Sequence, residues 1–175
     1  MRLPCLGKYR QQGATLVELV MTIVIIGVAV AGVVGAFSLI TGRSADPLNQ
    51  TRAVALAQLY MDEILARHYD ESSKVGGGKV PAAQVDCASP GADGETRADY
   101  DDVDDYHDIT NAIPEDGESI PLPGYSNFRI SIAVACAGND ISEMPLANAD
   151  AKRIDITITD PSGNDYLFSA YRGNF

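Results

Sequence analysis

The chain has 175 residues, of which 24 are acidic and 13 are lysine or arginine, so its formal charge is -11. This balance disfavours nucleic-acid binding, because contacts to phosphate need clustered cationic side chains. With the apolar N-terminal segment set aside, roughly 100 residues remain, which is enough for one small domain.

A long apolar segment covers residues 14–42, in which Glu18 is the only ionisable side chain. A helix of this length spans about 43 Å, more than the hydrocarbon core of a bilayer, which is about 30 Å thick. The segment therefore predicts one membrane span. It is too long for a secretory signal peptide, whose apolar part has about 7–15 residues. A carboxylate inside a bilayer is costly unless it is paired, so Glu18 needs a partner.

Charges on the two sides of this span predict its orientation. Arg2, Lys8 and Arg10 precede it, whereas Arg43 alone closely follows it and is soon followed by Asp46. By the positive-inside rule, we expect a single-pass protein of a bacterial inner membrane, with its N-terminus in the cytoplasm and its C-terminal part in the periplasm.

The sequence QGATLVEL at residues 12–19 resembles the prepilin signature of type IV pilins and pseudopilins. The resemblance implies that a prepilin peptidase cuts between Gly13 and Ala14 and that the new amino group of Ala14 is methylated. Residues 1–13 are then a leader peptide, residues 14–42 a transmembrane and assembly helix, and residues 43–175 a globular domain. The family usually has Phe where Ala14 stands; cleavage depends more on the glycine.

Glu18 would be the fifth residue of the processed chain. Inside an apolar fibre or membrane, an unpaired carboxyl group tends to protonate, whereas the N-terminal ammonium of a neighbouring subunit would satisfy it and fix the axial register. The alternative is a tolerated glutamate near the end of a plain anchor. The implied partners are prepilin peptidase, other major and minor pilins, the inner-membrane assembly platform, and the bilayer before extraction.

A second helix is predicted after a break at Ser44–Pro47, because proline removes a backbone donor and disfavours helical geometry in the preceding residue. Helical spacing of apolar residues then predicts a helix over residues 51–69, with one apolar face suited to packing on a sheet. Its apolar positions are Ala53, Leu56, Ala57, Tyr60, Ile64 and Leu65. Glycine and proline break any periodicity from Glu71 to Thr96, which predicts irregular structure.

The chain has three cysteines, and Cys5 lies in the predicted leader. In an oxidising compartment, the remaining pair, Cys87 and Cys136, is expected to form one disulfide. The cross-link would close a loop of about 50 residues and stabilise the fold by about 4 kcal/mol on the chain-entropy model. The alternative is two buried thiols without a bond.

An aspartate-rich stretch runs from Asp99 to Asp108, and two interpretations compete. Clustered carboxylates are the ligands that calcium requires, although the spacing does not match an EF-hand loop. The alternative, which we favour, is a solvated loop whose aspartates bind nearby backbone amides. Interleaved apolar side chains indicate that the segment docks on the domain. The weak calcium candidates are Asp99, Asp101, Asp102, Asp104 and Asp105.

The C-terminal third is rich in strand signals. Residues 128–136 and 153–159 alternate between apolar and polar side chains, a turn follows at Asp160–Asn164, and residues 166–171 form the next candidate strand. Three antiparallel strands in a meander are expected. Ile154, Ile156 and Ile158 would face the apolar side of the second helix.

These elements predict an α+β protein that resembles the type IV pilin fold, with a protruding hydrophobic helix and a second helical half on a small antiparallel sheet. The stretch DDVDDYH and the segment from Arg153 to Phe175 also resemble minor pilins of the mannose-sensitive haemagglutinin type of pilus. The resemblance implies a minor pilin, a non-enzymatic subunit that assembles or primes an extracellular pilus for surface attachment.

Two other functions are alternatives to a minor pilin. A pseudopilin of a type II secretion system would carry the same leader. An anchored periplasmic enzyme would need a catalytic constellation, and the sequence shows no nucleophile elbow, phosphate loop or metal-ligand spacing, with His68 and His107 isolated. We expect no catalytic residues and no cofactor.

Overall fold

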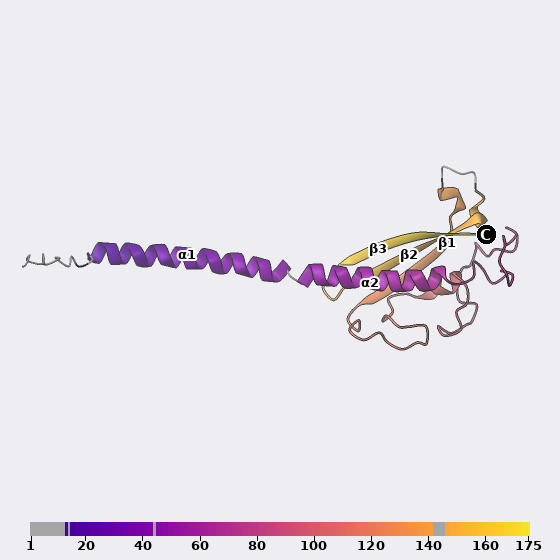
Figure 1. Ribbon diagram of the computed structural model, residues 1–175, viewed down its shortest axis with the longest axis horizontal. Helices are drawn as coiled ribbons and strands as arrows, with labels where there is room; N and C mark the ends of the chain where they lie inside the picture. The colour runs from indigo at the N-terminus through magenta and orange to yellow at the C-terminus, as the bar shows by residue number, and fades with distance from the viewer. Residues whose placement is uncertain (1–12, 14, 44, 142–145) are drawn as a thin grey trace, which may run out of the picture. The chain divides into compact units, whose positions relative to one another are not determined.

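The computed structural model describes residues 13, 15–43, 45–141 and 146–175, and it divides into two compact units, residues 1–45 and 46–175. The elements follow one another in an α-then-β order (Figure 1). The helices are α1 (Leu16–Arg43) and α2 (Ala45–Leu65), with 3₁₀-helices η1 (Asp104–Asp108), η2 (Gly138–Asp140) and η3 (Asn148–Asp150). The strands are β1 (Arg129–Cys136), β2 (Ala151–Thr159) and β3 (Asp165–Gly173).

Helix α1 is apolar on every side. Its large hydrophobic side chains from Leu16 to Phe37 are exposed, and no residue of its apolar window is buried. A helix that is hydrophobic all round needs an apolar environment, because in water its hydrophobic side chains would be exposed on every side. Among the described residues, one helix is long and apolar enough to cross a membrane, over Leu16–Ser38.

Helix α2 corrects the predicted boundaries. It begins at Ala45 rather than at residue 51, and it ends at Leu65 rather than at residue 69. Pro47 lies in the first turn, where the backbone amides have no intrahelical acceptor, so its missing N–H costs little there. The predicted break at Ser44–Pro47 is therefore wrong for Asp46 and Pro47; Ser44 itself lies outside the described residues.

The three strands form one antiparallel sheet in the order β1-β2-β3, as predicted. Each strand starts or ends within two residues of its predicted limit. Asp160 forms the turn between β2 and β3 by accepting hydrogen bonds from the amides of Ser162 and Asn164, at 2.8 and 2.9 Å. In the register, Ile156 lies opposite Ile132 on β1 and Phe168 on β3.

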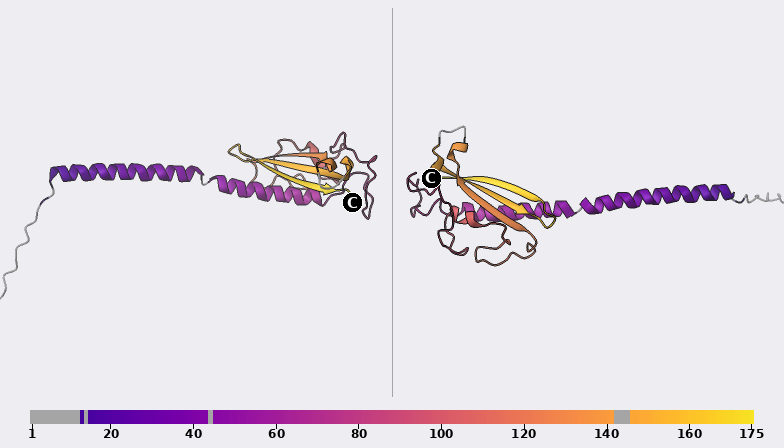
Figure 2. Two further views of the ribbon diagram at one scale, coloured as in Figure 1. Left: turned by 90° about the horizontal axis from the view of Figure 1, so that it is seen from above. Right: turned by 180° about the vertical axis from the view of Figure 1, so that it is seen from behind.

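The core lies between α2 and one face of the sheet, and the views in Figure 2 show α2 running along the strands. Alternation places Ile154, Ile156 and Ile158 on this inner face, and each is fully buried. The predicted apolar face of α2 meets them, with Ala53, Leu56, Ala57, Tyr60 and Ile64 buried. The α+β class and the helix-on-sheet packing are thus confirmed, and they are consistent with the pilin fold.

The chain between α2 and β1 is irregular apart from η1, as predicted for its first part. It still contributes to the core, because Tyr100, Val103 and Tyr106 are buried in the same cluster as α2 and the sheet. The expectation that the aspartate-rich stretch docks on the domain is therefore confirmed.

Candidate functional site

The predicted processing segment lies at the start of α1. Gly13 is exposed and has no regular secondary structure, whereas Ala14 lies outside the described residues, as does the predicted leader up to residue 12. Helix α1 begins two positions after Ala14, at Leu16. An exposed glycine outside regular secondary structure suits a peptidase, which needs an unfolded backbone at the bond that it cuts.

Thr15 caps the first turn of α1. Its hydroxyl accepts a hydrogen bond from the amide of Glu18 at 3.3 Å, and its carbonyl accepts one from the amide of Leu19 at 3.1 Å. Threonine followed three residues later by glutamate is the sequence of a capping box. The conformation of this turn is therefore determined locally, by Thr15 and Glu18 themselves.

Glu18 is exposed in the first turn of α1. In the part of the chain that the structure describes, its carboxylate has no ion-pair or hydrogen-bond partner, although its carbonyl accepts a hydrogen bond from the hydroxyl of Thr22 at 2.7 Å. Its neighbours along α1 are apolar. In a membrane or a helix bundle, such a carboxylate needs a cation from another chain, and the role predicted for Glu18 stays a prediction.

The apolar segment that begins in this turn has 23 residues, Leu16–Ser38. At the rise of an α-helix it is about 35 Å long, which is sufficient for a bilayer core of about 30 Å. Gly13, Glu18 and the span therefore lie in the order that membrane insertion, cleavage and lateral packing require.

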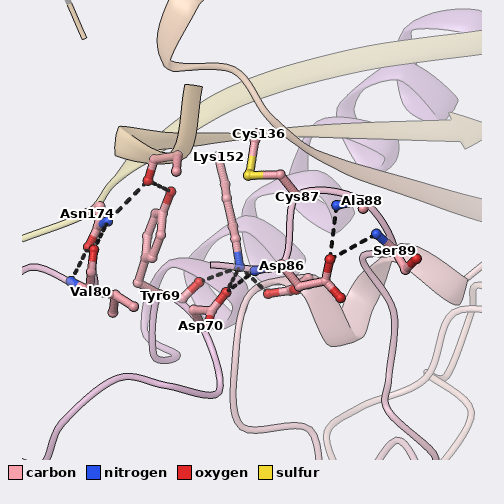
Figure 3. Close-up of a disulfide and its surroundings, with 12 residues drawn as sticks. Tyr69, Asp70, Val80, Asp86, Cys87, Ala88, Ser89, Cys136, Lys152 and Asn174 are labelled. Atoms are coloured by element: carbon pink, nitrogen blue, oxygen red, sulfur yellow. Dashed lines mark hydrogen bonds and ion pairs between the residues drawn. A yellow bond between two sulfur atoms is a disulfide. The ribbon is translucent and has the colours of Figure 1, made fainter. Parts of the chain in front are cut away.

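In the second unit, Cys87 and Cys136 form a disulfide with their Cα atoms 5.4 Å apart (Figure 3). Cys136 ends β1, and its partner in the β1–β2 ladder is Lys152. The cross-link therefore holds the irregular chain around residue 87 against the edge of the sheet, next to a buried lysine.

Lys152 is 1 % exposed and is the centre of a polar cluster that the sequence analysis missed. Its ammonium donates to the carbonyl of Tyr69 at 2.8 Å, to Asp70 Oδ2 at 3.1 Å and to Asp104 Oδ1 (Figure 3). Asp70 Oδ2 also accepts a hydrogen bond from the amide of Asp86, which precedes the disulfide. The cluster thus joins the segment after α2, the disulfide-linked loop, η1 and β2.

The aspartate-rich stretch is only partly solvated, which corrects the prediction of a solvated loop. Asp102, Asp104 and Asp105 are buried, because the interleaved apolar residues pull the segment into the core. The predicted local capping is confirmed. Asp105 Oδ2 accepts from the amides of Asp101 and Asp102, at 2.8 and 2.9 Å, and Asp102 Oδ1 accepts from those of Asp104 and Asp105, at 2.9 and 3.3 Å.

The structure brings two of the five calcium candidates together with a glutamate. Asp101 and Asp105 come together with Glu95, and one carboxylate oxygen of each lies within 4.8 Å of the others. Asp99 accepts a hydrogen bond from Thr96, while Asp104 pairs with Lys152. The predicted five-aspartate set is therefore not one site.

Burial raises the pKa of Asp102 to about 8, with a further contribution from the neighbouring Asp104 carboxylate. Burial also raises the pKa of Asp105. A carboxyl group that stays protonated at neutral pH lowers the negative charge beside Asp104, so that the single cation of Lys152 suffices for the cluster.

A second polar cluster joins α2 to the segment before η1. Arg97 lies 2.8 Å from Glu63 Oε1, and its guanidinium lies 4.8 Å from the ring centre of Tyr106. Tyr106 donates its hydroxyl hydrogen to Glu63 at 2.8 Å. Although burial alone would raise it, these hydrogen bonds hold the pKa of Glu63 below its usual range. No periodic pattern in the sequence links Glu63 to Arg97, which lies 34 residues further along the chain.

Comparisons with known proteins bear on the N-terminal segment. A family model described as the prokaryotic N-terminal methylation motif matches residues 8–34, which include Gly13, Glu18 and most of α1. The match supports a type IV pilin-like protein, either a pilin or a pseudopilin, and points to a structural subunit that is processed by prepilin peptidase. No curated protein and no solved structure shows significant similarity to the chain.

Proposed function

We propose that the chain is a minor type IV pilin, a non-enzymatic subunit that takes part in assembling or priming an extracellular pilus for surface attachment. Its chemistry is assembly: insertion, cleavage after Gly13, methylation of Ala14, extraction from the bilayer and packing of α1 against other subunits. In this account the chain is the substrate of the peptidase.

One observation carries the proposal. The methylation motif matches at residues 8–34, and the match includes most of an apolar helix that is long enough to cross a membrane. The small α+β domain after it supplies a helix packed on an antiparallel sheet. The resemblance of its acidic stretch and C-terminal segment to haemagglutinin-type minor pilins supports the minor role.

The proposed location follows from the same elements. Before assembly, α1 anchors the chain in the bacterial inner membrane, with the leader in the cytoplasm and residues 46–175 in the periplasm. After extraction, the subunit belongs to the pilus at the cell surface. Its partners are prepilin peptidase, other major and minor pilins and the inner-membrane assembly platform.

The alternative is a pseudopilin of a type II secretion system. The methylation motif favours it equally, because the motif is common to pilins and pseudopilins. The two functions differ in what the assembled fibre does.

A comparison of two cell fractions separates these functions. Cells expressing the chain are sheared, and the fibres are probed for it, while the culture supernatants of wild-type and deletion strains are compared for exported enzymes. The pilin proposal predicts the chain in sheared fibres and unchanged export. Loss of enzyme export, with no chain in the fibres, contradicts it and favours the pseudopilin.

Mass spectrometry of the mature N-terminus tests processing. We expect a chain that starts at Ala14, with a mass increase of one methyl group on the α-amino nitrogen. A chain that retains residues 1–13 in a strain with active prepilin peptidase would contradict both functions.

A further inference from the structure

A cavity of about 180 Å³ is lined by the loop that follows α2, by the end of β3 and by the C-terminal Phe175. Three cations line it, Arg67, Lys74 and Arg172, together with the imidazole of His68. No aspartate or glutamate is among the described residues that line it. In a chain with 24 acidic residues and 13 lysines and arginines, such a gathering of cations without acids is unusual.

Arg172 has no carboxylate partner among the described residues, and its Nε is buried without a hydrogen-bond acceptor. Its neighbour across the β2–β3 ladder is Lys152. Lys152 is paired with Asp70 and Asp104, so those carboxylates are already engaged by another cation. Within the described residues, Arg172 is thus left without an ion pair, which a bound anion would supply.

The glycine loop supplies backbone donors to the same cavity. Gly76, Gly77 and Gly78 have φ angles of +103°, +83° and +111°, which residues with a side chain rarely adopt. The amide of Gly77 donates to the carbonyl of Lys74 at 3.0 Å, whereas within the described residues the amides of Gly76 and Gly78 have no acceptor. Successive amides in such turns form concave sites that attract anions.

The other two cations, Arg67 and Lys74, differ in whether their side chains are held by partners. Arg67 is held in place, because its Nε donates to the hydroxyl of Tyr106 at 3.2 Å and its Nη2 lies 3.6 Å from Glu63 Oε1. Lys74 is exposed and has no ion pair within the described residues. The cavity thus combines a guanidinium held by its neighbours, a guanidinium without a carboxylate partner and an exposed ammonium.

We propose that this cavity binds an oxyanion, the phosphate or carboxylate group of a ligand. Its volume equals that of about six water molecules at about 30 Å³ each, which is enough for one such group and the first atoms attached to it. Planar guanidinium groups bind both anions through paired hydrogen bonds, and the free amides of the glycine loop add further donors. This site does not depend on the proposed role in pili.

Titration of the detergent-solubilised full chain tests the site. Amide ¹⁵N–¹H shifts are followed while sodium phosphate or sodium acetate is added, with sodium chloride at equal ionic strength as the reference. We expect saturable shifts at Gly76, Gly77 and Gly78. Saturation with phosphate alone assigns a phosphate ligand, saturation with acetate alone assigns a carboxylate, and either result supports the proposal. Shifts no larger than those with chloride for both anions overturn it.

Three charge-removing variants locate the site. Arg172→Gln should weaken binding at least tenfold, because it removes a charge-assisted contact. Lys74→Gln should weaken it less, since an exposed lysine acts mainly as a point charge. Arg52→Gln is the matched control: it removes one exposed cation of α2, about 20 Å along the helix from Leu65, and should leave binding unchanged.

If Arg172→Gln fails to fold, the exposed Lys74 decides the question, because its side chain lies outside the core. Equal effects of Lys74→Gln and Arg52→Gln on the dissociation constant would show a general charge effect and would overturn the proposal.

Discussion

Lys152 lies two residues before Ile154 on the inner face of β2, but the predicted strand began at residue 153, so its burial was not predicted. A buried ammonium needs carboxylate partners. Which carboxylates these are could not be predicted either. Asp70 and Asp104 are 82 and 48 residues away along the chain, and only the folded path of the irregular segments brings them to Lys152.

Lys152→Met should destabilise the fold by about 3–5 kcal/mol, because it leaves two buried carboxylates without their cation. Urea unfolding of the full chain in detergent measures the loss. Arg153→Met is the control: the side chain of Arg153 is 37 % exposed in its ion pairs with Asp140 and Asp155, and its loss should destabilise the fold far less than the loss of Lys152. Similar losses for both variants would contradict the central role of Lys152.

Asp102 makes stability depend on pH. With its pKa raised to about 8, the folded state keeps a proton that the unfolded chain releases near pH 4. The folded state therefore binds more protons in this range, and the free energy of unfolding falls as the pH rises from about 4 to about 8. The raised pKa of Asp105 acts in the same direction.

Asp102→Asn should flatten this dependence, because the amide cannot ionise while its oxygen still accepts the amide hydrogen bonds of Asp104 and Asp105. Urea unfolding at pH 5, 6.5 and 8 compares the two proteins, and the variant should gain stability relative to the wild type at the highest pH. Parallel curves would show that Asp102 ionises normally in the folded state.

The role proposed for Glu18 in assembly can be tested by replacing its side chain. Glu18→Ala should leave cleavage after Gly13 largely intact and reduce the amount of the chain in sheared fibres, because the fibre loses an axial ion pair. Glu18→Gln keeps the size of the side chain and removes the charge, and should show the same defect. Fibres that contain either variant at the wild-type level would show that the carboxylate is not needed for register.

At the scale of elements, periodicity predicted what packing later confirmed. Alternating isoleucines located β2, and the helical spacing from Ala53 to Ile64 identified the buried face of α2. The predicted start of α2 is too late, because proline breaks a helix in its interior but is tolerated in its first turn, where Pro47 lies. The Glu63–Arg97 contact joins residues 34 apart through an irregular loop, and no periodic pattern encodes such a pair.

The disulfide constrains this irregular chain. Replacing both cysteines in a Cys87→Ser, Cys136→Ser double variant should lower the free energy of unfolding by about 4 kcal/mol, because a loop of about 50 residues gains freedom in the unfolded state. Cys5→Ser, which leaves the cross-link intact, is the matched control. Equal midpoints of urea unfolding for the double variant and the control would contradict this stabilising role.

At the scale of the whole molecule, residues 46–175 form a compact unit with a core of their own. A fragment of these residues should fold without detergent, because none of the α1 side chains that the structure describes belongs to that core. Circular dichroism and cooperative urea unfolding check this, together with size-exclusion chromatography. A fragment that aggregates, or that unfolds without a cooperative transition, would show that the unit depends on α1.

The exposed turn between β2 and β3 offers a place for a fluorescent label. The proposed cleavage would remove Cys5, and Cys87 and Cys136 are joined in a disulfide, so a single Ser162→Cys change would give the processed chain one reactive thiol. Ser162 contributes its backbone amide to the turn, and any residue except proline keeps that donor. A maleimide dye attached there would make individual copies of the protein visible on living cells.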